Sequence, residues 1–287
     1  MPDGGFLRYD VVGTGPDTVV VPGGFLLRDS LAALGDRLTV IFYDPLGRGQ
    51  SAPVVDSTHV TMARVVADLE ELRRHVGASR IGLIGFSILS AVAANYAFSH
   101  PDRVSRLALL GAVGVAATDS APPPPPDLVS RLDSAAQRRL AHLDSTDGAT
   151  TDPRGYCETY WRANVGLFVA DPADGPAFPL GFCQYPNEAP ASFGRWIGWL
   201  QGSMGAYDYG VQAAALEVPV LVVHGERDDL SSLAGARRWA VMPPNGRLLL
   251  LPGIGHLSYF EDAATVRAAL REFFSGGWPP EATVGSK

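Results

Sequence analysis

The sequence contains very little lysine and no cluster of basic residues. Its single lysine is Lys287, and the formal net charge is −7. Because nucleic acids are bound through positively charged surfaces, we expect no nucleic-acid partner. Long apolar runs are also absent, and no stretch of about eighteen apolar residues could form a membrane helix. Residues 1–5 lack the basic start of a signal peptide. We therefore expect a cytoplasmic protein with no membrane partner.

Cysteine is scarce as well. Cys157 and Cys183 are the two cysteines of the chain, so a framework of several disulfides is excluded. One bridge between them stays open, but a cytoplasmic setting favours two reduced thiols.

No two histidines have the spacing of a metal site with carboxylates or thiols, and we expect neither a metal nor another cofactor.

Strand-like and helix-like segments alternate along much of the 287 residues. Residues 6–12 and 18–21 are β-rich, and the glycine- and proline-containing segment 13–17 predicts a hairpin-like connection between them. Residues 61–75 carry apolar side chains at helical spacing. Strands separated by helices predict an α/β fold, with a mostly parallel central sheet covered by helices on both faces.

The alternation stops after Gly114. An unbroken proline run, Pro122 to Pro126, lies within 121–127. Proline can neither continue a helix nor occupy a central strand, so this segment predicts an extended, exposed connector. The chain is then irregularly helical and rich in aromatic residues to about residue 211. We expect one core formed by 1–114 and 212–287, with 115–211 inserted into it.

Ser87 has the sequence context of an exposed nucleophile. The apolar run 80–84 leads into Gly85-Phe86-Ser87, and the run of small residues 90–97 follows. This order predicts a strand, a sharp turn and a helix, which would lift the serine hydroxyl above the end of the sheet. A serine alone is a poor nucleophile at neutral pH, so the hypothesis requires a base and a carboxylate elsewhere in the chain.

Both groups follow downstream. Asp228 comes just after the strand-like run 220–223, and His256 lies in a glycine-rich loop. Asp229 and Glu226 are rivals for the carboxylate; the spacing His-Gly-x-x-Asp resembles that of the α/β-hydrolase family at Asp228, and this resemblance favours Asp228. The order Ser87, Asp228, His256 is that of the α/β-hydrolase triad.

The chain resembles the α/β-hydrolase superfamily, in the branch related to proline iminopeptidases. Besides the triad order, the resemblance rests on four segments: Val19 to Phe25, Asp44 to Ser51, His256 to Glu261, and Phe273 to Pro279. It implies that 115–211 form a helical cap over the nucleophile. It also implies an acyl-enzyme mechanism in which His256 takes the Ser87 proton and Asp228 holds the histidine.

The resemblance further implies an oxyanion hole built from the backbone amides of Ile88 and Gly24, with Phe25 as the next candidate. Leu89 departs from the family, which usually has a small residue there; either the helix is displaced or the side chain fills a space beside the turn. Pro22 stands where histidine is usual. We expect the pocket to include Phe25, Tyr160, Trp161, Trp196 and Leu257.

These features predict a serine hydrolase that cleaves a small apolar ester, lactone, thioester or amide. Three alternatives stay open. The first is acyl transfer, cyclisation or carbon–carbon bond cleavage on the same triad, and the second is a catalytically silent protein that binds a small ligand. The third is a proline iminopeptidase activity, for which the insertion offers Glu158 and Glu188 but no recognisable amine-binding segment. The expected partner is a small-molecule substrate, and the chain is expected to be a monomer or a homodimer.

Overall fold

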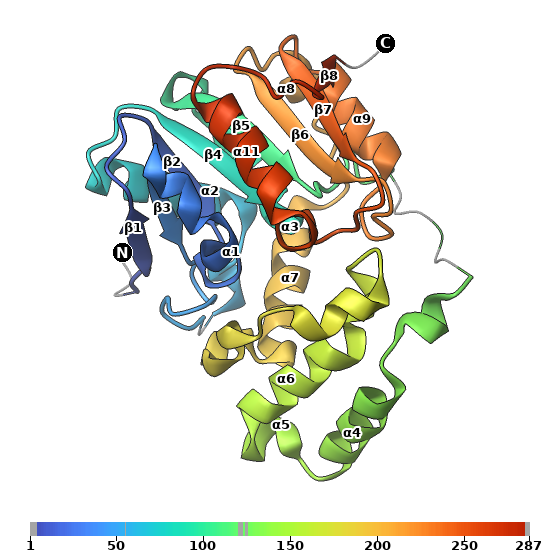
Figure 1. The fold of residues 1–287 in the computed structure, drawn as a ribbon. Coiled ribbons are helices and arrows are strands. Elements are labelled where there is room, and N and C mark those ends of the chain that lie inside the picture. The colour runs from blue at the N-terminus through green and yellow to red at the C-terminus, as the bar shows by residue number, and fades with distance from the viewer. Residues whose placement is uncertain (1–4, 55, 120–122, 124–125, 285–287) are drawn as a thin grey trace.

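The computed structural model describes residues 5–54, 56–119, 123 and 126–284. In these residues an eight-stranded sheet has the order β1-β3-β2-β4-β5-β6-β7-β8 (Figure 1). The outer strands β1 and β8 are antiparallel to their neighbours, and the other pairs are parallel. The predicted α/β fold is confirmed. The strands are β1 (Tyr9–Val12), β2 (Thr18–Pro22), β3 (Thr39–Tyr43), β4 (Ile81–Phe86), β5 (Val104–Leu110), β6 (Val220–Gly225), β7 (Gly246–Leu251) and β8 (Thr283–Val284).

The predicted hairpin between the first two strands is wrong. β1 pairs with β3, and β3 lies between β1 and β2. The connecting segment crosses the start of β3 at very close range. A Cβ atom at Gly15 would lie 1.9 Å from the carbonyl oxygen of Arg37, and one at Gly13 would lie 2.2 Å from that of Leu38. The glycines therefore serve a close backbone crossing rather than a tight reversal.

Helices cover both faces of the sheet and enclose two apolar layers. One layer packs α2, α3 and α9 against the sheet, and the other packs α1 and α11 against the opposite face. The strands of such a sheet are buried on both sides, which explains why β4 and β6 are buried along their whole length. The helices of the two layers are α1 (Gly24–Leu31), α2 (Met62–His75), α3 (Ile88–Ser99), α9 (Leu233–Val241) and α11 (Ala263–Phe274).

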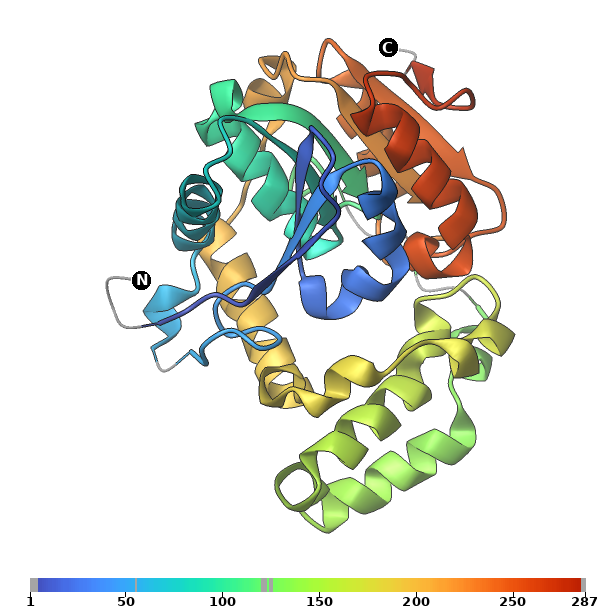
Figure 2. The ribbon, with the colours of Figure 1, turned by 60° about the vertical axis from the view of Figure 1, so that its left-hand side comes forward.

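Between β5 and β6 the chain is helical. Figures 1 and 2 both show α4, α5 and α6 grouped beyond one end of the sheet, with α7 leading back toward it. The predicted boundary at residue 211 falls inside α8. Much of the proline connector, at residues 121, 122, 124 and 125, lies outside the described residues. The helices are α4 (Ser134–Ser145), α5 (Gly148–Thr151), α6 (Pro153–Asn164), α7 (Pro190–Met204) and α8 (Gly210–Ala214).

The two cysteines form a disulfide, so the prediction of two reduced thiols is wrong. Cys157 lies in α6 and Cys183 in the 3-10 turn η7 (Gly181–Gln184). Packing of η7 against α6 brings their Cα atoms to 5.6 Å, which is within the usual range for a bridge. This contact depends on how the insertion folds, and the spacing of 26 residues along the chain gives no sign of it.

No helix in the described part of the chain is long and apolar enough to cross a membrane.

Candidate active site

Ser87 lies in a sharp turn between β4 and α3. Its φ of 50° and ψ of −128° lie outside the regions that most L-residues adopt. The turn is held by two backbone hydrogen bonds, from the Ser87 amide to the Leu110 carbonyl and from the Ser90 amide to the Ser87 carbonyl. A strained serine fixed by its surroundings is typical of a functional position.

The residues on either side of Ser87 explain why this turn needs its particular sequence. A Cβ atom at Gly85 would lie 2.6 Å from the Cα of Ser90, so a larger residue would push α3 away from β4. Leu89 is buried and points beside the turn, and a Cβ at Gly23 would lie 2.8 Å from its Cδ1 atom. The structure therefore shows the second of the two outcomes expected for Leu89: its side chain fills the space over the loop at Gly23.

Asp228 and His256 are joined by a hydrogen bond. Nδ1 of His256 lies 2.8 Å from Oδ2 of Asp228, and both side chains are buried. The other carboxylate oxygen accepts hydrogen bonds from the amides of Leu230 and Ser231. Burial alone would raise the pKa of Asp228, but the charge and the hydrogen bond of His256 outweigh it and lower that pKa below its usual value. The carboxylate is thus ionised and can fix the histidine with Nδ1 protonated and Nε2 free.

A second histidine, His224, lies beneath this pair at the end of β6. It is 1% exposed, and its Nδ1 is 3.9 Å from Oδ2 of Asp228. Neither of its ring nitrogens has a hydrogen-bond partner in the described part of the chain. Burial lowers the pKa of His224, so the ring is neutral near pH 7. At this distance it forms no hydrogen bond to the carboxylate, so Oδ2 of Asp228 remains bound to His256.

The insertion contacts the loops that carry both groups. The carbonyl of Phe168 accepts a hydrogen bond from the amide of His256, 2.9 Å away. Glu261 accepts hydrogen bonds from the amides of Ala170, in the insertion, and of Gly255, beside the histidine. Nη1 of Arg131 is 2.5 Å from a carboxylate oxygen of Asp229. We call these contacts the first anchor of the insertion.

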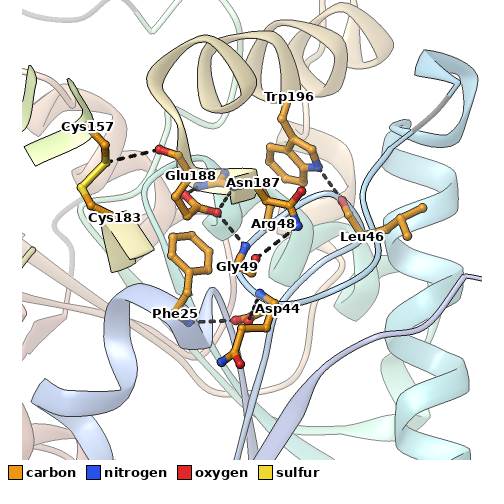
Figure 3. Close-up of polar contacts among 11 residues, drawn as sticks. Phe25, Asp44, Leu46, Arg48, Gly49, Cys157, Cys183, Asn187, Glu188 and Trp196 are labelled. Carbon is orange, nitrogen blue, oxygen red and sulfur yellow. Dashed lines mark hydrogen bonds and ion pairs between the residues drawn. A yellow bond between two sulfur atoms is a disulfide. The ribbon is translucent and has the colours of Figure 1, made fainter. Parts of the chain in front are cut away.

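The amides expected to form the oxyanion hole are not equivalent. Gly24 and Ile88 are the first residues of α1 and α3, so their N–H groups have no acceptor within their own helices. The amide of Phe25 instead donates to Oδ1 of Asp44 at 2.8 Å (Figure 3). Phe25 as an oxyanion donor is therefore a wrong prediction, because its amide already binds a carboxylate.

Ser87 and His256 line one cavity of about 80 Å³ beneath the insertion. Of the predicted pocket residues, Phe25, Trp161 and Leu257 line it. Tyr160 does not; its ring packs edge-on against Trp161. Trp196 does not either, because its Nε1 donates to the carbonyl of Leu46 and its ring lies against Arg48 (Figure 3).

The cavity also has walls that the sequence did not reveal. Most are apolar, from Leu26, Phe86, Ile88, Leu89, Phe168, Phe178, Phe182, Phe193, Ile197 and Tyr259. Two are charged: Arg48, from the loop after β3, and Glu188, from the 3-10 turn η8 (Pro186–Glu188). They are 140 positions apart in the chain, so no local pattern could pair them. The sequence offered a separate signal for each: Arg48 lies in the segment Asp44 to Ser51, and Glu188 was a candidate glutamate of the insertion.

The fold and this arrangement define an α/β hydrolase. The sequence matches the family described as alpha/beta hydrolase fold over residues 19–263, and the chain belongs to this family. A proline iminopeptidase of Xylella fastidiosa (strain 9a5c) is 27% identical over 248 residues, 78% of this chain and 76% of the relative. The predicted resemblance to the proline iminopeptidase-like branch is thereby confirmed.

Other relatives have different activities. A non-heme haloperoxidase of Rhodococcus erythropolis is 27% identical over 252 residues, 82% of this chain and 81% of the relative. Among solved structures, 2-hydroxy-6-oxo-6-phenylhexa-2,4-dienoate hydrolase from Rhodococcus sp. strain RHA1 has a TM-score of 0.71 at 22% identity, covering 95% of this chain and 96% of that chain. The likeness to this structure shows the shared fold.

Proposed function

We propose that the chain is a serine hydrolase that cleaves a small apolar ester, lactone, thioester or amide through an acyl-enzyme on Ser87. The observation that carries the proposal is the strained Ser87 turn in the same cavity as a histidine already bound to a buried carboxylate. His256 takes the serine proton through Nε2, and Asp228 stabilises the imidazolium that forms. Water, activated by the same histidine, then releases the acid.

The oxyanion of the tetrahedral intermediate is stabilised by the amides of Gly24 and Ile88. Both belong to helix starts, where the helix dipole favours negative charge. The loss of one such donor raises the barrier by about 3–4 kcal/mol. Asp44 supports the site indirectly, because it fixes the backbone at Phe25 and Gln50.

We propose that the insertion acts as the cap and sets the substrate. The cavity is small and mostly apolar, which favours short apolar groups over large or charged ones. The small-molecule partner is thus an uncharged acyl compound. We keep the cytoplasmic location and the monomeric or homodimeric state as predictions.

The proline iminopeptidase activity has less support. Recognition of a substrate ammonium in a closed cleft requires carboxylates that are free to pair with it. Glu188 already accepts two hydrogen bonds from Arg48, and Glu158 pairs with Arg154 on the exposed side of α6. The two candidate glutamates are both engaged with arginines of this chain.

A fluorophosphonate probe and a substrate panel test the proposal. The probe should label the protein once, and Ser87→Ala should abolish labelling without lowering the melting temperature. Nitrophenyl butyrate and hexanoate should be cleaved at least about tenfold faster than proline nitroanilide, a difference of about 1.4 kcal/mol in barrier. Full labelling of the Ser87→Ala variant would overturn the nucleophile. Faster cleavage of the anilide would restore the aminopeptidase. Labelling without turnover of any ester would favour a dedicated pathway enzyme or a silent binder.

A further inference from the structure

The cavity contains a buried ion pair that the proposed reaction does not use. Nε and Nη2 of Arg48 donate to Oε1 and Oε2 of Glu188 at 3.0 and 2.8 Å. The side chains are only 3% and 2% exposed. Figure 3 shows Glu188 directed from the insertion toward Arg48 and Gly49 of the core. Buried ion pairs of this kind carry a large desolvation cost, so a pair in the substrate cavity calls for an explanation.

The hydrogen bonds of Arg48 leave one of its nitrogens unused. Nε and Nη2 bind Glu188, whereas Nη1 has no partner in the described part of the chain. The guanidinium is enclosed by three rings: its Cζ lies 4.6 Å from the ring centroid of Phe25, 4.8 Å from that of Phe193 and 4.9 Å from that of Trp196. These contacts fix its position, and a fixed donor loses little entropy when it binds an acceptor.

The pair also limits which charges the cavity accepts. Glu188 neutralises Arg48, and its Oε1 accepts a further hydrogen bond from the amide of Gly49. An anionic substrate would be attracted by Arg48 but repelled by Glu188. A cationic substrate would be attracted by Glu188 but repelled by Arg48. A neutral oxygen acceptor gains the Nη1 hydrogen bond with no net charge to oppose it.

We propose that Arg48 is a specificity-determining residue that donates a hydrogen bond from Nη1 to a neutral oxygen of the substrate. This inference rests on the proposed hydrolase function. The substrate class is therefore an otherwise apolar acyl compound with a ketone, ether or second ester oxygen away from the scissile bond. Glu188 holds Arg48 in place and excludes carboxylate-bearing analogues. Phe25 contacts Arg48 and directly follows Gly24, so this oxygen binds close to the oxyanion hole.

Matched ester pairs test this assignment. Nitrophenyl hexanoate is compared with nitrophenyl 5-oxohexanoate, and nitrophenyl pentanoate with nitrophenyl 4-oxopentanoate, so that the added oxygen lies in the acyl part. Butyl hexanoate is compared with 2-methoxyethyl hexanoate, in which the added oxygen lies in the alcohol part. In at least one pair the oxygenated ester should have a kcat/KM about tenfold higher, the effect of one hydrogen bond from a charged donor. Arg48→Met should bring that ratio close to 1. Arg28→Met, which removes an arginine from an exposed ion pair with Asp10, is the control and should keep the wild-type ratio.

Two further variants separate recognition from folding. Arg48→Met/Glu188→Met replaces the pair with apolar side chains, a change that is often neutral or stabilising, and it should also lose the preference. Glu188→Gln leaves the positive charge unbalanced and should raise the relative kcat/KM of the nitrophenyl monoester of glutaric acid about tenfold. If no pair shows a preference in the wild type, or the preference survives in the double variant, the assignment is wrong while the hydrolase proposal stands. No turnover of any ester overturns both.

Discussion

Asp228 and Asp229 are adjacent in the chain, yet their carboxylates face different partners. Asp228 binds His256 and the amides of the following loop, and it is fully enclosed. Asp229 is partly exposed and pairs with Arg131 of the insertion. One carboxylate therefore belongs to the proposed triad, and its neighbour belongs to the first anchor.

Substitution of each aspartate separates these roles. Asp228→Asn should lower kcat by about 10⁴-fold, because the histidine loses the group that fixes its tautomer. Asp229→Asn should lower kcat only slightly but reduce the melting temperature, because the buried guanidinium of Arg131 loses its ionic partner. The measurements are steady-state kinetics and thermal unfolding of both variants. The opposite ranking of kcat would assign the triad carboxylate to Asp229.

At the scale of the element, the disulfide joins α6 to η7 and closes a loop within the insertion. The peptide carbonyl of Glu188 lies 3.5 Å from Sγ of Cys157, so the bridge lies next to the residue that contacts Arg48 (Figure 3). A cross-link at this point restricts the unfolded insertion more than the folded one.

Removal of the bridge should cost stability. For cysteines 26 positions apart, the chain-entropy account predicts that Cys157→Ala/Cys183→Ala lowers the free energy of unfolding by about 3–4 kcal/mol. Denaturant titration of the variant and of the oxidised wild type measures the difference. Wild type reduced with dithiothreitol is the matched control and should resemble the variant. Equal stability of oxidised and reduced protein would contradict the prediction.

Sequence reasoning succeeded where the pattern was local and failed where two distant segments had to meet. Gly85 and Ser87 lie in one short motif, so a strand, turn and helix could be predicted there. The pairing of Cys157 with Cys183 depends on the fold of the insertion, whose irregular helices gave no clear period. The position of β3 between β1 and β2 is likewise a property of the whole sheet, which turn-forming residues at 13–17 could not reveal.

At the scale of the whole molecule, burial of His224 links stability to pH. Burial lowers its pKa in the folded state. Above a pH of about 6.5, the ordinary pKa of histidine, both the folded and the unfolded states hold the ring neutral. Below that pH the unfolded chain binds a proton that the folded chain resists, so the free energy of unfolding falls as the pH falls, until the folded pKa is reached.

His224→Gln should remove this contribution. The slope of unfolding free energy against pH below 6.5 should decrease by up to about 1.4 kcal/mol per pH unit, the value for one proton. Denaturant unfolding at a series of pH values measures it, with His142→Gln on the exposed side of α4 as the control. An unchanged slope in the His224 variant would show that the buried ring does not drive the acid sensitivity.

The insertion is held at two places on either side of the cavity. The first anchor joins it to the histidine and aspartate loops. At the second, Glu188, Asn187 and Trp196 bind the loop 46–51. For protein engineering, the two anchors determine where the insertion of another hydrolase could be joined to this core. The segments Phe168 to Ala170 and Asn187 to Trp196 must stay with the core that they bind. New substrate walls can be introduced between them, in the segment 171–182, where Phe178 and Phe182 already line the cavity and the bridged Cys183 is left in place.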